Sequence, residues 1–167
     1  MRFAGESTGT THGTREAVYA YRCFASLLIG SIHGVSNEEL WVPRYTAVPG
    51  LWDDAPLVET INVIGSGTCK TNNPPAVRGT CHVVRTLEAA LWAFERTHGF
   101  HEGSLAAVKL GDDTDTTDAV NGQLARAFYG ASTIPAPWLE RLSMEATIRD
   151  MADCSFEIGH KDRSVTS

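Results

Sequence analysis

The sequence lacks any apolar run long enough to cross a membrane, because a spanning helix needs about 20 consecutive apolar residues. The longest candidate, from Cys23 to Ile32, is much shorter and begins too late for a secretory signal. The four cysteines are scattered and form no CxxC pair, which argues against a structural zinc site and favours reduced thiols. We therefore expect a cytoplasmic protein with no membrane partner.

Positive charge is scarce as well. Fourteen Lys and Arg residues stand against twenty Asp and Glu residues, which gives a net charge of −6. Proteins that bind nucleic acid carry clustered Lys and Arg, so nucleic acid is not the expected partner. With 43% apolar residues, the 167-residue chain has the composition of a soluble globular domain.

Alternating strand patterns are missing, whereas apolar residues at helical spacing occur along the chain. They predict helices over residues 15–33 and 57–64, between Thr86 and Gly99, over 102–110, between the acidic segment 112–118 and Gly130, and after Pro137. Ser36 and Glu39 form a capping box that opens a short helix before Pro43. The fold class is therefore all-α, with residues 1–154 as one partial domain and 155–167 as a polar tail.

Two apparent motifs fail on their context. Residues Gly5 to Gly9 match G-x-S-x-G, but a nucleophile elbow needs a preceding strand and only four residues come before it. The acidic run is no EF-hand, because its sixth loop position would be Asp118 in place of glycine.

The segment GDDTDTTD, residues 111–118, contains the side chains of this sequence that are best suited to bind a metal ion. Asp113 and Asp115 can converge on one cation, with the Thr116 hydroxyl as a third oxygen ligand. Oxygen ligands suit Mg²⁺, Mn²⁺ or Ca²⁺ better than zinc. The alternative is an acidic helix start, in which Thr114 or Asp115 caps the helix and the other carboxylates favour its dipole.

The stretches GTCHVVRTLEAALWAF, LGDDTDTTDAVNGQLARAFYG and IPAPWLERL, with SNEEL and Thr11-His12-Gly13 upstream, resemble the ADP-ribosylglycohydrolases. This resemblance implies an all-α helical enzyme with two Mg²⁺ or Mn²⁺ ions beside an ADP-ribose pocket. It assigns Asp113 and Asp115 a catalytic role and makes Asp113, Asp115 and Thr116 metal ligands. His12 would lie on the wall of the ADP-ribose pocket, although a histidine with only local hydrogen bonds is an equally good interpretation.

The sequence departs from the family pattern in two places. The family's Thr-Asp-Asp-Thr element has no match upstream of Thr11, and Met1-Arg2-Phe3-Ala4 resembles only the end of its N-G-S-x-M-R element. We therefore expect a truncated, C-terminal half that binds at most one metal ion, and weakly. The family usually has Gly-Tyr where this chain has Cys81-His82. His82 can still stack on a ribose or base as a substrate-binding residue, whereas a Cys81–His82 catalytic dyad is disfavoured because adjacent side chains rarely face each other.

Two functions follow from the resemblance. One is metal-dependent hydrolysis of the glycosidic bond between ADP-ribose and an acceptor side chain, with a complementary N-terminal half supplied separately. The other is a catalytically silent fragment, or a module that binds ADP-ribose or a protein partner. In both, the expected partner is an ADP-ribosylated protein or a small molecule that contains ADP-ribose, and the isolated chain is expected to be inactive.

Overall fold

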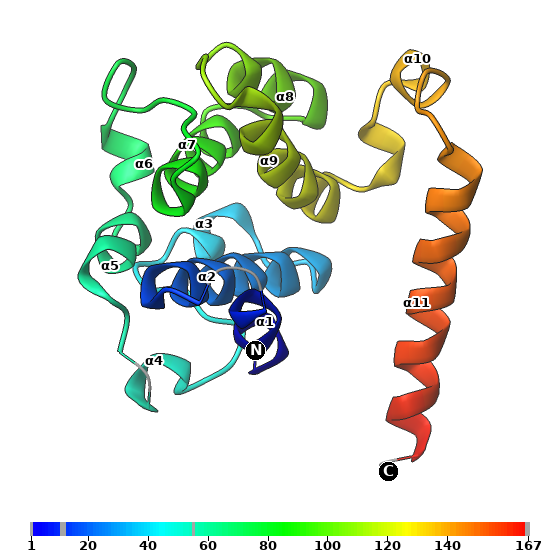
Figure 1. Ribbon diagram of the computed structural model, residues 1–167, viewed down its shortest axis with the longest axis horizontal. Coiled ribbons are helices and arrows are strands. Elements are labelled where there is room, and N and C mark those ends of the chain that lie inside the picture. The colour runs from blue at the N-terminus through cyan, green and yellow to red at the C-terminus, as the bar shows by residue number, and fades with distance from the viewer. Residues whose placement is uncertain (1, 11–12, 55, 166–167) are drawn as a thin grey trace. The chain divides into compact units, whose positions relative to one another are not determined.

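The computed structural model describes residues 2–10, 13–54 and 56–165, and over these residues the chain is helical with no strand. This confirms the all-α prediction. Figure 1 shows the helices in chain order. They are α1 (Arg2–Gly9), α2 (Arg15–Ile32), α3 (Asn37–Leu40), α4 (Leu51–Asp54), α5 (Glu59–Gly65), α6 (Thr68–Thr71), α7 (Val83–Glu95), α8 (Phe100–Val108), α9 (Thr114–Tyr129), the 3₁₀ helix η1 (Ala131–Thr133), α10 (Ala136–Leu139) and α11 (Glu145–Val165).

The chain divides into two compact units, Met1–Thr133 and Ile134–Ser167. In the first unit α7 is the central helix, and it packs against α2, α6, α8 and α9. Its apolar face is buried, as the side chains of Leu87, Leu91 and Phe94 are at most 4% exposed. These side chains form the core together with buried residues of the neighbouring helices, including Leu27, Leu40, Ile61, Ile64 and Leu124.

Several predicted helix ends are confirmed. Thr14 caps α2 by accepting a hydrogen bond from the Ala17 backbone N–H at 3.2 Å. The predicted capping box of α3 is present: the Ser36 hydroxyl accepts from the Glu39 N–H and the Glu39 carboxylate accepts from the Ser36 N–H. Gly130 ends α9 with a φ of 91°, a backbone conformation that favours glycine.

Three predicted details of the helices are wrong. The helix predicted to start after Thr86 begins at Val83, and Thr86 lies inside its first turn with its hydroxyl donating to the His82 and Thr80 carbonyls. The stretch between residue 64 and Thr86, for which no helix is predicted, contains α6. The single helix predicted after Pro137 is two helices, α10 and α11, separated by a break in which Met144 has a φ of 60°.

The second unit contains α10 and α11, and none of its described side chains is buried. Within the predicted polar tail, residues 155–165 belong to α11, and residues 155–159 are exposed. No helix in the described part of the chain is both long and apolar enough to cross a membrane. The G-x-S-x-G match forms most of α1, which rules out a nucleophile elbow there.

Candidate functional site

The acidic segment forms a tight turn between α8 and α9. Gly111 and Asp112 both have positive φ, at 78° and 58°, so the chain reverses sharply before α9 begins at Thr114. Asp113 occupies the N-cap position, but its side chain makes no capping hydrogen bond. The alternative in which Thr114 or Asp115 caps the helix is therefore wrong, and the Asp113 carboxylate is not used to cap the helix.

Buried contacts fix the backbone of this turn. The Thr117 side chain is fully buried, and its hydroxyl donates a 2.9 Å hydrogen bond to the Asp113 carbonyl. Gly79, from the segment before α7, packs directly against the same turn. A Cβ at position 79 would lie 2.7 Å from the Gly111 carbonyl oxygen and 3.0 Å from Thr117 Oγ1. The glycine is therefore required by close backbone approach, which places Cys81 and His82 next to the acidic turn.

Two side chains lie at the Asp113 carboxylate. The Thr116 hydroxyl donates a 2.8 Å hydrogen bond to Asp113 Oδ1. The Cys81 thiol lies close to the same carboxylate. The negative charge of Asp113 raises the pKa of this thiol above its ordinary value, and hydrogen bonding to Asp113 and the charge of Asp115 raise it further. Thr116 thus lies at the Asp113 carboxylate, and Cys81 lies close enough to Asp113 and Asp115 for both charges to act on its thiol.

This arrangement partly fits a divalent cation. Asp113, Asp115 and Thr116 offer only oxygen atoms, which are the donors that Mg²⁺ and Mn²⁺ prefer. Within residues 2–10, 13–54 and 56–165, however, no group of three or more His, Cys, Asp or Glu side chains is placed to hold a metal ion. The two carboxylates and the hydroxyl supply only part of the coordination shell of a divalent cation. Waters or other ligands would have to complete that shell.

His82 lies at the N-cap position of α7, where its side chain makes no capping hydrogen bond. Its Nε2 atom is 3.8 Å from Glu16 Oε2, at the start of α2. The Thr60 hydroxyl, at the start of α5, donates a 2.9 Å hydrogen bond to Glu16 Oε1. The adjacent Cys81 and His82 therefore contact different partners, Asp113 and Glu16, and form no dyad. His12, the other predicted substrate-binding residue, lies outside the described residues.

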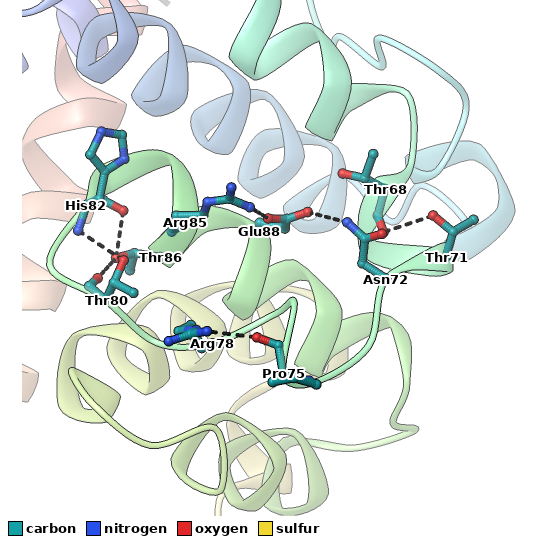
Figure 2. A network of polar contacts seen from close by, with 10 residues as sticks. All are labelled: Thr68, Thr71, Asn72, Pro75, Arg78, Thr80, His82, Arg85, Thr86 and Glu88. Carbon is teal, nitrogen blue, oxygen red and sulfur yellow. Dashed lines mark hydrogen bonds and ion pairs between the residues drawn. The ribbon is translucent and has the colours of Figure 1, made fainter.

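Polar contacts hold the segment that carries Gly79 and His82 (Figure 2). Near its end, the Thr86 hydroxyl donates to the Thr80 carbonyl at 2.6 Å and to the His82 carbonyl at 3.2 Å. At its start, Asn72 Nδ2 donates to the buried Glu88 carboxylate at 3.0 Å, and Arg85 donates to the other oxygen of Glu88 at 2.9 Å. Both ends are thus attached to α7.

The sequence did not single out Glu16, Thr60 or Gly79 as site residues. Glu16 and Thr60 are polar residues in the first turns of two helices, where such residues are common for reasons of capping and dipole alone. Only the packing of α2, α5 and α7 brings them beside His82. Gly79 differs, because a glycine shortly before a helix can signal close backbone approach.

Comparisons with known proteins identify the family to which this chain belongs. The profile of the family described as ADP-ribosylglycohydrolase matches residues 1–164. The ADP-ribosylarginine hydrolase Tri1 of Serratia proteamaculans is 34% identical over 146 residues, or 87% of this chain and 37% of the relative. The ADP-ribosyl-[dinitrogen reductase] glycohydrolase of Rhodospirillum rubrum is 33% identical over 87 residues, covering 51% of this chain and 30% of the relative.

The similarity extends to three dimensions. A solved structure described as an ADP-ribosylglycohydrolase-related protein complex superposes with a TM-score of 0.79 at 36% sequence identity, covering 90% of this chain and 50% of that one. The chain thus spans between about a third and a half of the length of these relatives. The family match over nearly the whole sequence confirms the resemblance: this chain belongs to the ADP-ribosylglycohydrolase family.

Proposed function

We propose that this chain forms the Asp113–Asp115 side of a metal-dependent site that hydrolyses the bond between ADP-ribose and an acceptor side chain. The observation that carries the proposal is the acidic turn before α9. Its carboxylates are not used for helix capping, and its backbone is fixed by the buried Thr117 and by Gly79. Holding like charges together costs free energy, so such a rigid acidic turn favours a cationic ligand.

Asp113, Asp115 and Thr116 would hold one Mg²⁺ or Mn²⁺ ion, weakly, because they supply few ligand atoms. A bound divalent cation supplies Lewis acidity toward the ribose oxygens and the attacking water. The fixed charges of Asp113 and Asp115 favour the positive charge that the ribose gains as the glycosidic bond breaks. His82 offers an exposed imidazole ring on which a ribose or base can pack.

The substrate class is an ADP-ribosyl group on an acceptor side chain, with arginine the first acceptor to test. Two relatives are named for such substrates, ADP-ribosylarginine and ADP-ribosylated dinitrogen reductase. All four cysteines are free, which fits a reducing cytoplasm as the place of action.

A second candidate function is binding of ADP-ribose without cleavage. It is favoured by the absence, in the part of the chain that the structure describes, of a group of three or more metal-binding side chains. Glycosidic cleavage requires the ribose, the water and the charges in fixed relation, and a misplacement of about 1 Å can cost roughly 100-fold in rate. We therefore propose that the 167 residues by themselves bind ADP-ribose but do not release it from an acceptor.

The experiment is chromatographic detection of free ADP-ribose released from an ADP-ribosylated arginine peptide, with Mn²⁺ and with chelator. We expect no release by the 167-residue chain. We expect release when the remaining N-terminal length of the Serratia relative is joined to it, and loss of that activity on Asp115→Ala. Chelator-sensitive release by the chain alone would contradict the proposal of binding without cleavage.

A further inference from the structure

Three polar side chains from three separate helices meet beside the proposed site. Glu16 comes from the first turn of α2, Thr60 from the first turn of α5, and His82 directly precedes α7. Thr60 Oγ1 is 2.9 Å from Glu16 Oε1, and His82 Nε2 is 3.8 Å from Glu16 Oε2. Glu16 therefore contacts both Thr60, at the start of α5, and His82, which follows Cys81 in the sequence.

The two carboxylate oxygens of Glu16 differ in their contacts. Oε1 accepts the hydrogen bond from Thr60, which orients the carboxylate. Oε2 lies 3.8 Å from the imidazole, which is longer than an N–H···O hydrogen bond of about 2.7–3.2 Å. The Glu16 side chain is 40% exposed. Oε2 therefore keeps lone pairs that a hydroxyl group of a bound ligand can reach.

The imidazole beside this carboxylate is well placed to contact a nucleoside. The His82 side chain is 59% exposed, so one face of its ring can pack on a base. A ribose attached to a base packed on this ring would lie near the ring edge, where His82 Nε2 is 3.8 Å from Glu16 Oε2. A carboxylate at such a position accepts a hydrogen bond from a ribose 2′-hydroxyl, and it repels a 2′-phosphate.

We propose that Glu16 is a specificity residue that recognises the unphosphorylated adenosine ribose of ADP-ribose and rejects its 2′-phosphorylated counterpart. Thr60 is a positioning residue, because it acts on the ligand only through Glu16. The inference rests on the proposed function, since it takes ADP-ribose as the ligand. The inference goes further, because it names the nucleotide that the site accepts and the side chain that discriminates against the other.

The test is calorimetric titration of the full chain with ADP-ribose and with 2′-phospho-ADP-ribose. We expect the unaltered chain to bind ADP-ribose at least about 10-fold more tightly, because loss of a hydrogen bond to a charged group has about that effect. Glu16→Gln keeps the shape and the Thr60 contact but removes the charge, and it should bring the two affinities within about 3-fold. Glu38→Gln, an exposed glutamate on α3, is the matched control and should leave the preference unchanged.

Two further variants separate recognition from folding. Thr60→Val should weaken ADP-ribose binding by about 3-fold, because the carboxylate loses its orienting hydrogen bond. His82→Ala should weaken both nucleotides equally, while His82→Phe, which keeps a flat ring, should restore most of the affinity. Helical circular dichroism should remain unchanged in every variant.

The outcomes distinguish a failure of the proposed function from a failure of the role assigned to Glu16. If the unaltered chain binds neither nucleotide, ADP-ribose binding itself is wrong, and the role of Glu16 with it. If the chain binds both nucleotides equally, or binds ADP-ribose preferentially and Glu16→Gln leaves that preference intact, then only the Glu16 assignment is overturned.

Discussion

At the residue scale, Asp113 makes its contacts through both backbone and side chain. Its carbonyl oxygen accepts a hydrogen bond from the buried Thr117, while its carboxylate accepts one from Thr116 and lies close to the Cys81 thiol. The backbone contact fixes where the carboxylate lies, and the side-chain contacts are weak enough to be exchanged for a ligand at an exposed site. The same residue thus anchors the turn and presents its charge.

The contact between Asp113 and Cys81 predicts a change in thiol reactivity. Because the thiolate is the reactive form and Asp113 raises the pKa of Cys81, Asp113→Asn should lower that pKa. Alkylation of Cys81 by iodoacetamide near pH 8 should then be several-fold faster, and its pH midpoint should move down.

Mass spectrometry of alkylated peptides measures this rate for each cysteine. Cys154, exposed on α11, is the internal reference, whereas burial raises the pKa of Cys23 and Cys69 to about 12 and keeps them slow. An unchanged Cys81 rate in the variant would show that Asp113 does not act on this thiol.

The close approach at Gly79 predicts a loss of stability when this glycine is replaced. In Gly79→Ala, the new Cβ would lie 2.7 Å from the Gly111 carbonyl oxygen, so the acidic turn must move. We expect a decrease of about 1–3 kcal/mol in the free energy of unfolding, as measured by urea denaturation. Gly9→Ala is the control, because a Cβ there meets nothing within 4 Å. Equal stability of the two variants would contradict the role given to Gly79.

At the scale of elements, apolar spacing predicted the helices that build the core, while their starts needed more than local signals. The first turn of α7 contains Val83 and Val84, which give no capping signature, so Thr86 was the nearest candidate for a cap. Its hydroxyl instead bonds back to the preceding turn, a role that Thr can play inside a helix. The predicted single last helix failed for a related reason, since no glycine marks the break at Met144.

The buried Glu88 network predicts how the segment before α7 is held. Glu88 is 4% exposed, and Asn72 donates to one of its oxygens. Asn72→Ala leaves that oxygen without this partner, which should lower the free energy of unfolding by about 1–3 kcal/mol. Asn73→Ala, at the exposed neighbouring position, should cost much less. If urea denaturation gives the two variants the same midpoint, the Asn72 contact does not stabilise the fold.

At the scale of the whole molecule, the two units differ in how much apolar surface they bury. Met1–Thr133 contains the core, whereas Ile134–Ser167 has no buried side chain among its described residues. Large apolar side chains of α11 are exposed, among them Ile148, Met151 and Phe156 at 51%, 67% and 67%. A helix that buries so little of its apolar surface gains little stability from packing, and isolated helices are marginal in water.

This difference predicts uneven hydrogen exchange. The amides of α7 and α9 should exchange slowly, with protection close to the global free energy of unfolding, and those of α11 should exchange within seconds. Mass spectrometry of deuterated peptides at several concentrations measures both. Protection of α11 equal to that of α7 in dilute solution would show that its apolar face is covered.

The candidate site could be predicted only where its residues are neighbours in sequence. Asp113, Asp115 and Thr116 stand within four positions, so their proximity follows from the chain itself. Cys81, Gly79 and Glu16 reach the site through tertiary packing between helices that are far apart in sequence, and no periodicity encodes that. The role of the Asp113 carboxylate likewise depended on a backbone turn with two positive φ angles.

The central claim is that Asp113 and Asp115 bind a divalent cation, and isothermal titration of the full chain with Mn²⁺ tests it most directly. We expect one weak site, which is lost in the double variant Asp113→Ala with Asp115→Ala. Asp112→Asn, which alters the adjacent exposed carboxylate, should leave binding unchanged. Two tight sites, no binding, or binding that survives the double substitution would contradict the claim.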